Sequence, residues 1–194
     1  MATRPTRQTY TTKKIIMDAF EHIVGLYLQE KNYWTRHSVK VELTKADKAK
    51  IKLPTIPRPE IDLVAYNPVS DTLVLIEAKS YLNSSGVTIG GLSGTDSKTK
   101  DRYRLLNNKT YQKVVTDRLV ENFVKNKIIK KSTKVKYALA AGHVQPKSLL
   151  AVSKYLKNND YLYFDPIDIK QTIKNLAQRG WDDNIITVTA KLTE

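Results

Sequence analysis

The stretch from Pro59 to Tyr81 constrains the fold more than any other part of the chain, because it predicts two strands joined by a short turn. Residues 60–66 alternate and are rich in Ile, Leu, Val and Tyr, as in a half-buried strand. Residues 67–71 are mostly turn formers. Residues 72–79 form a nearly continuous apolar run, which is typical of a strand buried on both faces. We therefore expect a hairpin whose second strand lies inside a sheet.

Charged side chains converge at the open end of this hairpin. Folding about the link between Val69 and Ser70 places Asp62 opposite Glu77, with Cβ atoms about 5 Å apart. Lys79 lies two residues beyond Glu77 and therefore shares its face. Two close carboxylates repel each other, and a divalent cation such as Mg²⁺ relieves that repulsion. The alternative is a solvated edge hairpin with a weak surface ion pair, and spacing alone leaves both open.

Composition narrows the class of protein and of partner. The 194 residues suit a single domain, residues 1–194, and carry 33 basic against 19 acidic side chains, a net charge of +14. Such an excess favours nucleic acid before membranes as the partner. The absence of cysteine excludes disulfides and cysteine-ligated zinc, and no apolar run approaches the roughly 20 residues of a membrane span. We therefore expect a cytoplasmic protein that binds DNA and no membrane.

Segments on either side of the hairpin predict alternating helices and strands. Before it we expect a flexible basic arm over 1–12, a helix over 13–30, a strand over 33–43 and a loop, alternatively a DNA-facing insertion, over 44–59. After it we expect a mobile Gly-rich loop over 83–98, largely one helix over 98–127, a strand over 134–141, a helix over 146–157, a strand over 161–164, a helix over 165–178 capped by Gly180, and a last strand over 184–192. This order predicts an α/β fold, with a central mixed sheet between two helical layers.

The spacing of the charged residues resembles a known signature. Asp62, followed after fourteen residues by Glu77-Ala78-Lys79, resembles the motif of the PD-(D/E)XK nuclease superfamily. The local pattern is similar to archaeal Holliday junction resolvases and YraN-like proteins, with E-x-x-A-x-x-Y-L on a helix, then G-E-I-D-L-I-A and L-V-x-V-E-x-K on strands. The corresponding residues here are Glu21, Val24, Tyr27 and Leu28, then Glu60–Ala65, then Leu73–Lys79. Pro59 replaces the glycine and an insertion separates the first two strands, so the branch within the superfamily stays open.

The resemblance implies a restriction-endonuclease-like core that hydrolyses DNA with Mg²⁺, for which Mn²⁺ substitutes. It implies that Asp62, Glu77 and the Ala78 carbonyl hold the metal, that Lys79 orients the attacking water or stabilises the transition state, and that Glu21 is a further catalytic carboxylate. Cleavage of both strands would favour a homodimer. A non-catalytic nucleic-acid-binding module on the same fold and an RNA-directed nuclease are the alternatives.

Two further candidates carry less weight. Glu60 is ranked lower because neighbours in a strand face opposite ways. Gln112 lies on the helix where related nucleases carry a glutamine that contacts the site, but Thr116 stands where their pattern has tyrosine.

The densest basic stretch follows the Gly-rich segment. It comprises Lys98, Lys100, Arg102, Arg104, Lys109, Lys113 and Arg118. A solvated helix face normally mixes charges, whereas here Asp101 and Asp117 are the only acids. We expect the first six of these residues to contact backbone phosphates.

Overall fold

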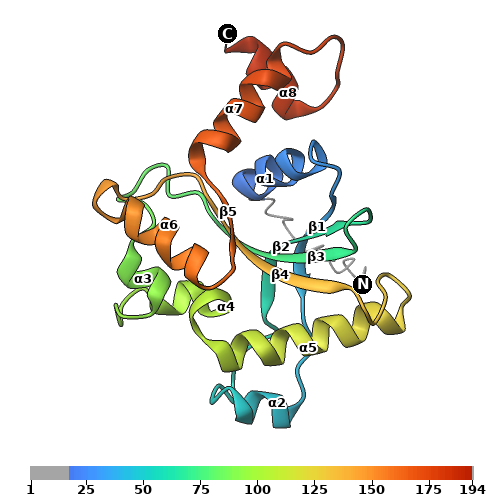
Figure 1. Cartoon of the computed structure of the whole chain (residues 1–194), viewed down its shortest axis with the longest axis vertical. Coiled ribbons are helices and arrows are strands. Elements are labelled where there is room, and N and C mark those ends of the chain that lie inside the picture. The colour runs from blue at the N-terminus through green and yellow to red at the C-terminus, as the bar shows by residue number, and fades with distance from the viewer. Residues whose placement is uncertain (1–17, 194) are drawn as a thin grey trace, which may run out of the picture.

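The fold is a five-stranded mixed sheet with helices on both faces (Figure 1). The computed structural model describes residues 18–193, so the expected arm over 1–12 and the start of the first helix lie outside the described residues. The strands are β1 (Trp34–Lys40), β2 (Glu60–Asn67), β3 (Thr72–Lys79), β4 (Lys134–Ala141) and β5 (Leu162–Phe164), in that order across the sheet. Neighbours among β1, β2 and β3 are antiparallel, whereas β4 and β5 continue the sheet in parallel. The expected α/β class with a mixed sheet is confirmed.

The helices form the outer layers. They are α1 (Ala19–Gln29), α2 (Lys45–Lys50), α3 (Ile89–Ser93), α4 (Arg104–Asn107), α5 (Lys109–Lys125), α6 (Leu149–Asn158), α7 (Pro166–Ala177) and α8 (Ile185–Leu192), with single 3₁₀ turns η1 (Lys100–Tyr103) and η2 (Pro146–Ser148). α1 and the start of α7 pack on one face of the sheet, and α5 crosses the other (Figure 1). A further cluster packs α3, α4 and α6 beside α5.

The central strand β3 explains the long apolar run in the sequence. Leu73 and Leu75 pack towards α5, whereas Val74 and Ile76 pack towards α1. All four side chains are at most 1% exposed. A strand between two helical layers has no solvent face, so its apolar residues do not alternate with polar ones.

The hairpin forms in the predicted register. Paired residues run from Asn67 and Thr72 back to Leu63 and Ile76, which centres the turn on the Val69–Ser70 link. The Asn67 side chain accepts hydrogen bonds from the Val69 and Ser70 amides, both at 3.0 Å, and so fixes the turn.

Three expected segments differ from the structure because short caps were not recognised. The loop expected over 44–59 contains α2, which begins with a capping box between Thr44 and Asp47. The loop expected over 83–98 contains α3, with buried Leu92. The single helix expected over 98–127 is instead η1, α4 and α5, because the Asn108 side chain accepts from the Tyr111 amide at 3.0 Å and begins a new helix.

The prediction of a last strand over 184–192 was wrong, because these residues form α8. Asn184 caps the helix by accepting from the Ile186 amide at 2.9 Å, and Asp182 accepts from the Thr187 hydroxyl at 3.1 Å. This capping outweighs the alternating β-branched residues, whose strand preference depends on a neighbouring strand to pair with. Gly180 does not cap α7 either, since the capping residue is Gln178.

Gly142 directly follows β4 and marks a close approach to the end of β3. A Cβ atom on Gly142 would overlap the backbone oxygen of Ser80 and lie 3.1 Å from the Phe20 ring. We expect Gly142→Ala to destabilise the protein by about 1–3 kcal/mol in urea unfolding, because the backbone beside Lys79 must move. Gly180→Ala is the matched control, since nothing lies within 4 Å of the added atom. Equal stability of the two variants would contradict this packing.

Candidate active site

Asp62, Glu77 and Lys79 meet at one end of the paired strands β2 and β3. The Lys79 Nζ atom lies 3.3 Å from Asp62 Oδ2 and also forms an ion pair with the Glu77 carboxylate. The side chains of Asp62, Glu77 and Lys79 are 23%, 14% and 17% exposed, so they are sheltered from bulk water but can still be reached by a ligand. The structure therefore brings together the three charged residues that the hairpin register predicted, and the solvated edge hairpin does not describe them.

The pairing of the strands is irregular at Asp62. The recorded β2–β3 pairs end at Leu63 and Ile76, and beyond them the Ala78 amide donates to Asp62 Oδ2 at 2.8 Å. On the other side, the recorded β1–β2 pairs omit Ser38 and Asp62, and Ser38 has a φ of 49°. A residue other than glycine seldom adopts a positive φ, so the strand geometry is interrupted at Ser38 although the register is the same on both sides. This interruption lies beside Asp62, whose side chain binds the end of β3.

Burial and the neighbouring charges together set the charge states of Glu77 and Lys79 on β3. It raises the pKa of Glu77, and nearby Asp62 raises it further, although Lys79 opposes both effects. Burial alone would lower the pKa of Lys79, but Glu77 and Asp62 outweigh it, so the net shift is upward. Lys79 therefore stays an ammonium group at neutral pH, and one ammonium faces two carboxylates.

Glu21 on α1 belongs to the same electrostatic environment. Its pKa is raised to about 7, first by burial and then by the charge on Asp62. Within residues 18–193 no hydrogen bond joins the Glu21 side chain to another residue. Glu21 is therefore near the carboxylates, as the resemblance implied, but does not contact them.

Replacing Glu21 with glutamine should stabilise the protein at pH 8 and change its stability little at pH 4. The folded pKa of about 7 lies above the ordinary value of 4.5, so folding favours the protonated carboxyl group. Stability from such a group is fully present below the unfolded pKa and is lost as pH rises through the folded pKa. Thermal unfolding of both proteins at pH 4, 6 and 8 measures the effect. A difference in melting temperature between the two proteins that is the same at every pH would contradict the raised pKa of Glu21.

A cavity of about 120 Å³ opens beside Glu77. Glu60 and Glu77 line it from the strands, whereas Arg102 and Arg104 line it from η1 and α4. Glu60 was ranked lower because neighbours in a strand face opposite ways, yet Glu60 and Glu77 line the same cavity. Asp101 lines it beside the two arginines, so guanidinium groups come from one side of the cavity and carboxylates from both.

The six expected phosphate-binding residues lie in different surroundings. Arg102 and Arg104 line the cavity beside Glu77, and Arg104 also pairs with Asp101 at 3.1 Å. Lys100, Arg104 and Lys109 line a neighbouring cavity of about 370 Å³. Lys98 is exposed.

The last two residues of the basic stretch each pair with a carboxylate. Lys113 forms an exposed ion pair with Asp117 along α5 at 3.0 Å, whereas Arg118 is bound to the buried Asp47.

Gln112 supports the fold instead of the site. Its side-chain amide donates to the Leu105 carbonyl and to the Tyr161 hydroxyl, both at 2.8 Å, and the residue is 7% exposed. These bonds tie α5 to α4 and to the residue preceding β5. Tyr103 also lies at the site, with its ring centre 6.0 Å from Lys79 Nζ. No sequence pattern singled out this tyrosine, because it precedes the long helix by several residues.

The donor set agrees with a hard cation that keeps several water ligands. Among residues 18–193, no group of three or more His, Asp or Glu side chains is placed to hold a metal ion. Mg²⁺ is commonly held by one or two carboxylates together with water and substrate phosphates. Asp62 and Glu77 provide two carboxylates on one side of the sheet, with one ammonium between them. Asp62 and Glu77 therefore fit Mg²⁺ or Mn²⁺ bound by two carboxylates. Without a cation, Lys79 is the group that neutralises them.

Comparison of the chain with protein-family models, with curated proteins and with solved structures found no match. Within the described part of the chain, none of the helices has the length and apolar character needed to cross a membrane.

Proposed function

We propose that the protein is a metal-dependent endonuclease that hydrolyses DNA phosphodiester bonds. The observation that carries this proposal is the meeting of Asp62, Glu77 and Lys79, with the Ala78 amide bound to Asp62, at the irregular end of a buried hairpin. The three charges are sheltered and converge on one place, and Glu77 lines a cavity to which Arg102 and Arg104 also contribute. This arrangement supports the PD-(D/E)XK resemblance and a restriction-endonuclease-like core.

Each residue has a role that its environment suits. Asp62 and Glu77 hold the cation, with the Ala78 carbonyl as a further oxygen donor. When bound, a divalent cation polarises a phosphoryl oxygen and lowers the pKa of a water ligand. Lys79 keeps its charge at neutral pH and stabilises negative charge that develops on the phosphate. Glu21 acts from a distance, by adding negative charge beside the cation.

The arginines of the cavity position the substrate. Arg102 is exposed, and its Nη1 atom lies 3.5 Å from the Tyr81 hydroxyl oxygen. Arg104 forms an ion pair with Asp101. One guanidinium group can donate two parallel hydrogen bonds to two oxygens of a phosphate. Arg102 and Arg104 therefore hold the phosphodiester against the carboxylates of Glu60 and Glu77 in the cavity. Two such sites related by twofold symmetry would cut both strands of a duplex, so the proposal includes a homodimer.

Cleavage of a panel of nucleic acids tests the proposal. Supercoiled plasmid, linear duplex, four-way junction, single-stranded DNA and RNA are incubated with the protein and Mg²⁺ or Mn²⁺, with a chelator control. We expect cation-dependent cutting of at least one DNA form. Cutting of RNA alone would favour the RNA-directed nuclease, and binding without any cutting would favour the non-catalytic module.

A further inference from the structure

The segment from Thr44 to Pro59, here called the 44–59 arm, has only basic residues among its exposed charges. Lys45 and Lys50 are exposed on α2 and Lys52 is exposed two residues after it, and within residues 18–193 none of the three forms an ion pair. Lys48 has a different role, since its Nζ donates to the Ile56 carbonyl at 2.7 Å and closes the arm on itself. The arm is therefore folded, with three lysines directed outwards.

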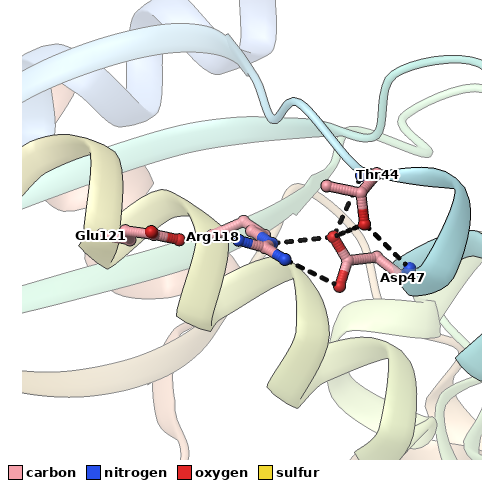
Figure 2. Close-up of polar contacts among 4 residues, drawn as sticks. All are labelled: Thr44, Asp47, Arg118 and Glu121. Carbon is pink, nitrogen blue, oxygen red and sulfur yellow. Dashed lines mark hydrogen bonds and ion pairs between the residues drawn. The ribbon is translucent and has the colours of Figure 1, made fainter.

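Asp47 is the single acidic residue of the arm, and its carboxylate is bound by Thr44 and Arg118 (Figure 2). The Arg118 guanidinium of α5 binds both oxygens of Asp47, with Nε to Oδ2 at 2.7 Å and Nη2 to Oδ1 at 3.2 Å. The Thr44 hydroxyl donates to the same carboxylate at 2.7 Å, and Glu121 binds the other side of Arg118 at 2.8 Å. Asp47 is 4% exposed, so its charge does not offset the lysines at the surface. The pair also fixes the arm to α5.

The arm is connected to the candidate active site by a short rigid path. The Pro59 carbonyl accepts from the Val41 amide at 2.8 Å, so both ends of the arm are paired. Asp62 follows Pro59 by three residues, about 10 Å along a strand, so the C-terminal end of the arm leads directly into the strand that carries Asp62. α2 and α7 lie at opposite ends of the molecule, with α5 beside α2 (Figure 1).

Lys52 occupies a backbone position that usually favours glycine. It has a φ of 58° after the end of α2, and the hydrogen bonds from Lys52 to Ala49 and from Leu53 to Lys48 form a Schellman motif around it. Residues other than glycine adopt this conformation at some cost, and Lys127 after the end of α5 is a second lysine that does so. A lysine at this position keeps a third cation on the exterior of the arm at a cost to local stability.

We propose that the 44–59 arm binds the phosphate backbone of the nucleic acid engaged at the candidate active site, through Lys45, Lys50 and Lys52. The inference rests on the proposed function for the identity of the ligand. The arm extends the binding surface for that nucleic acid beyond the reacting phosphate, and the Asp47–Arg118 pair holds the arm against α5. Since such contacts are electrostatic, they strengthen binding to any sequence and weaken with added salt.

The test is binding of a 20-base-pair duplex in the presence of chelator, measured by fluorescence anisotropy between 50 and 200 mM salt. The triple variant Lys45→Gln, Lys50→Gln, Lys52→Gln should bind about tenfold more weakly, and its salt dependence should lose about 0.9 in log–log slope for each contact removed. The matched control replaces the exposed residues Lys157, Lys170 and Lys174 with glutamine, which removes the same charge from α6 and α7. The control should keep the slope of the unmodified protein.

Lys52→Gly separates binding from folding. Glycine relieves the strain at positive φ, so this variant should melt at a higher temperature and yet bind the duplex more weakly. Equal losses in the arm and control triple variants, no binding by the unmodified protein, or tighter binding to anionic lipid vesicles than to the duplex would overturn the inference. Cleavage by the unmodified protein is scored separately with Mg²⁺. If the unmodified protein cuts DNA but the arm triple variant binds the duplex as tightly as the unmodified protein does, the proposed role of the arm is contradicted and the nuclease function is not. If the arm triple variant binds more weakly but the unmodified protein does not cut, the nuclease function is contradicted and the role of the arm is not.

Discussion

Lys79→Ala should lower the rate of DNA cleavage by about a hundredfold to a thousandfold, while the affinity for DNA changes only a few-fold. The ammonium of Lys79 lies between Asp62 and Glu77, where charge would develop on a bound phosphate, and removal of one such group typically costs a factor of 10²–10³ in rate. Lys79 is only 17% exposed, so it adds little to contacts with the phosphate backbone. Single-turnover cleavage and anisotropy binding measure the two quantities on the same duplex.

The control for this variant is Lys174→Ala on α7, which removes an exposed ammonium far from the hairpin. It should cleave at the rate of the unmodified protein. The melting temperature of Lys79→Ala must also be followed, because Asp62 and Glu77 then repel each other without a counter-charge. Added Mn²⁺ should raise the melting temperature of this variant more than that of the unmodified protein. Cleavage at an unchanged rate by Lys79→Ala would show that the activity comes from elsewhere.

Arg118→Ala should lower the midpoint of thermal unfolding by at least about 5 °C, the largest stability effect that we expect on the surface of α5. The substitution leaves the buried Asp47 carboxylate with only its bonds to Thr44, as Figure 2 makes plain. An uncompensated buried charge is far more costly than the loss of a surface pair. Glu121→Ala is the control, since it removes a 67% exposed partner of the same arginine and should shift the midpoint by about 1 °C or less.

The difference in stability between the unmodified protein and Arg118→Ala should become smaller as the pH falls. Hydrogen bonds from Arg118 and then from Thr44 hold the pKa of Asp47 well below its ordinary value of 3.8. A carboxylate with a lowered pKa contributes stability above the unfolded pKa and loses it as pH falls through the folded pKa. The gap between the unmodified protein and Arg118→Ala should therefore narrow below about pH 4. A gap that stays constant down to pH 2 would mean that the Asp47 charge has no part in it.

The hairpin and its charged end could be predicted because the information is local. The turn residues from Asn67 to Asp71 fix a symmetrical register, and that register alone places Asp62 opposite Glu77. β4 could also be assigned, from residue 134 to 141, because it is a short apolar run between polar segments. In these cases the period of the sequence and the tertiary environment favour the same structure.

The errors arose where a short polar signal competes with a longer pattern. Residues 184–192 alternate like a strand, but capping by Asn184 and burial of Thr187 make them a helix. Asn108 divides a basic stretch that otherwise suits one helix. The engagement of Arg118 by Asp47 joins residues 71 positions apart, and no local pattern contains it. The irregular pairing at Ser38 and Asp62 likewise depends on three strands together.

The most direct test of the central claim is Mn²⁺ binding to the unmodified protein and to Asp62→Asn by isothermal titration calorimetry. The account predicts about one Mn²⁺ per chain with release of protons, because burial raises the pKa of Glu77 and a bound cation displaces the proton. It also predicts that Asp62→Asn loses this binding while keeping its fold. Equal binding by the two proteins, or no binding at millimolar Mn²⁺, would contradict the assignment of Asp62 and Glu77 as the cation site.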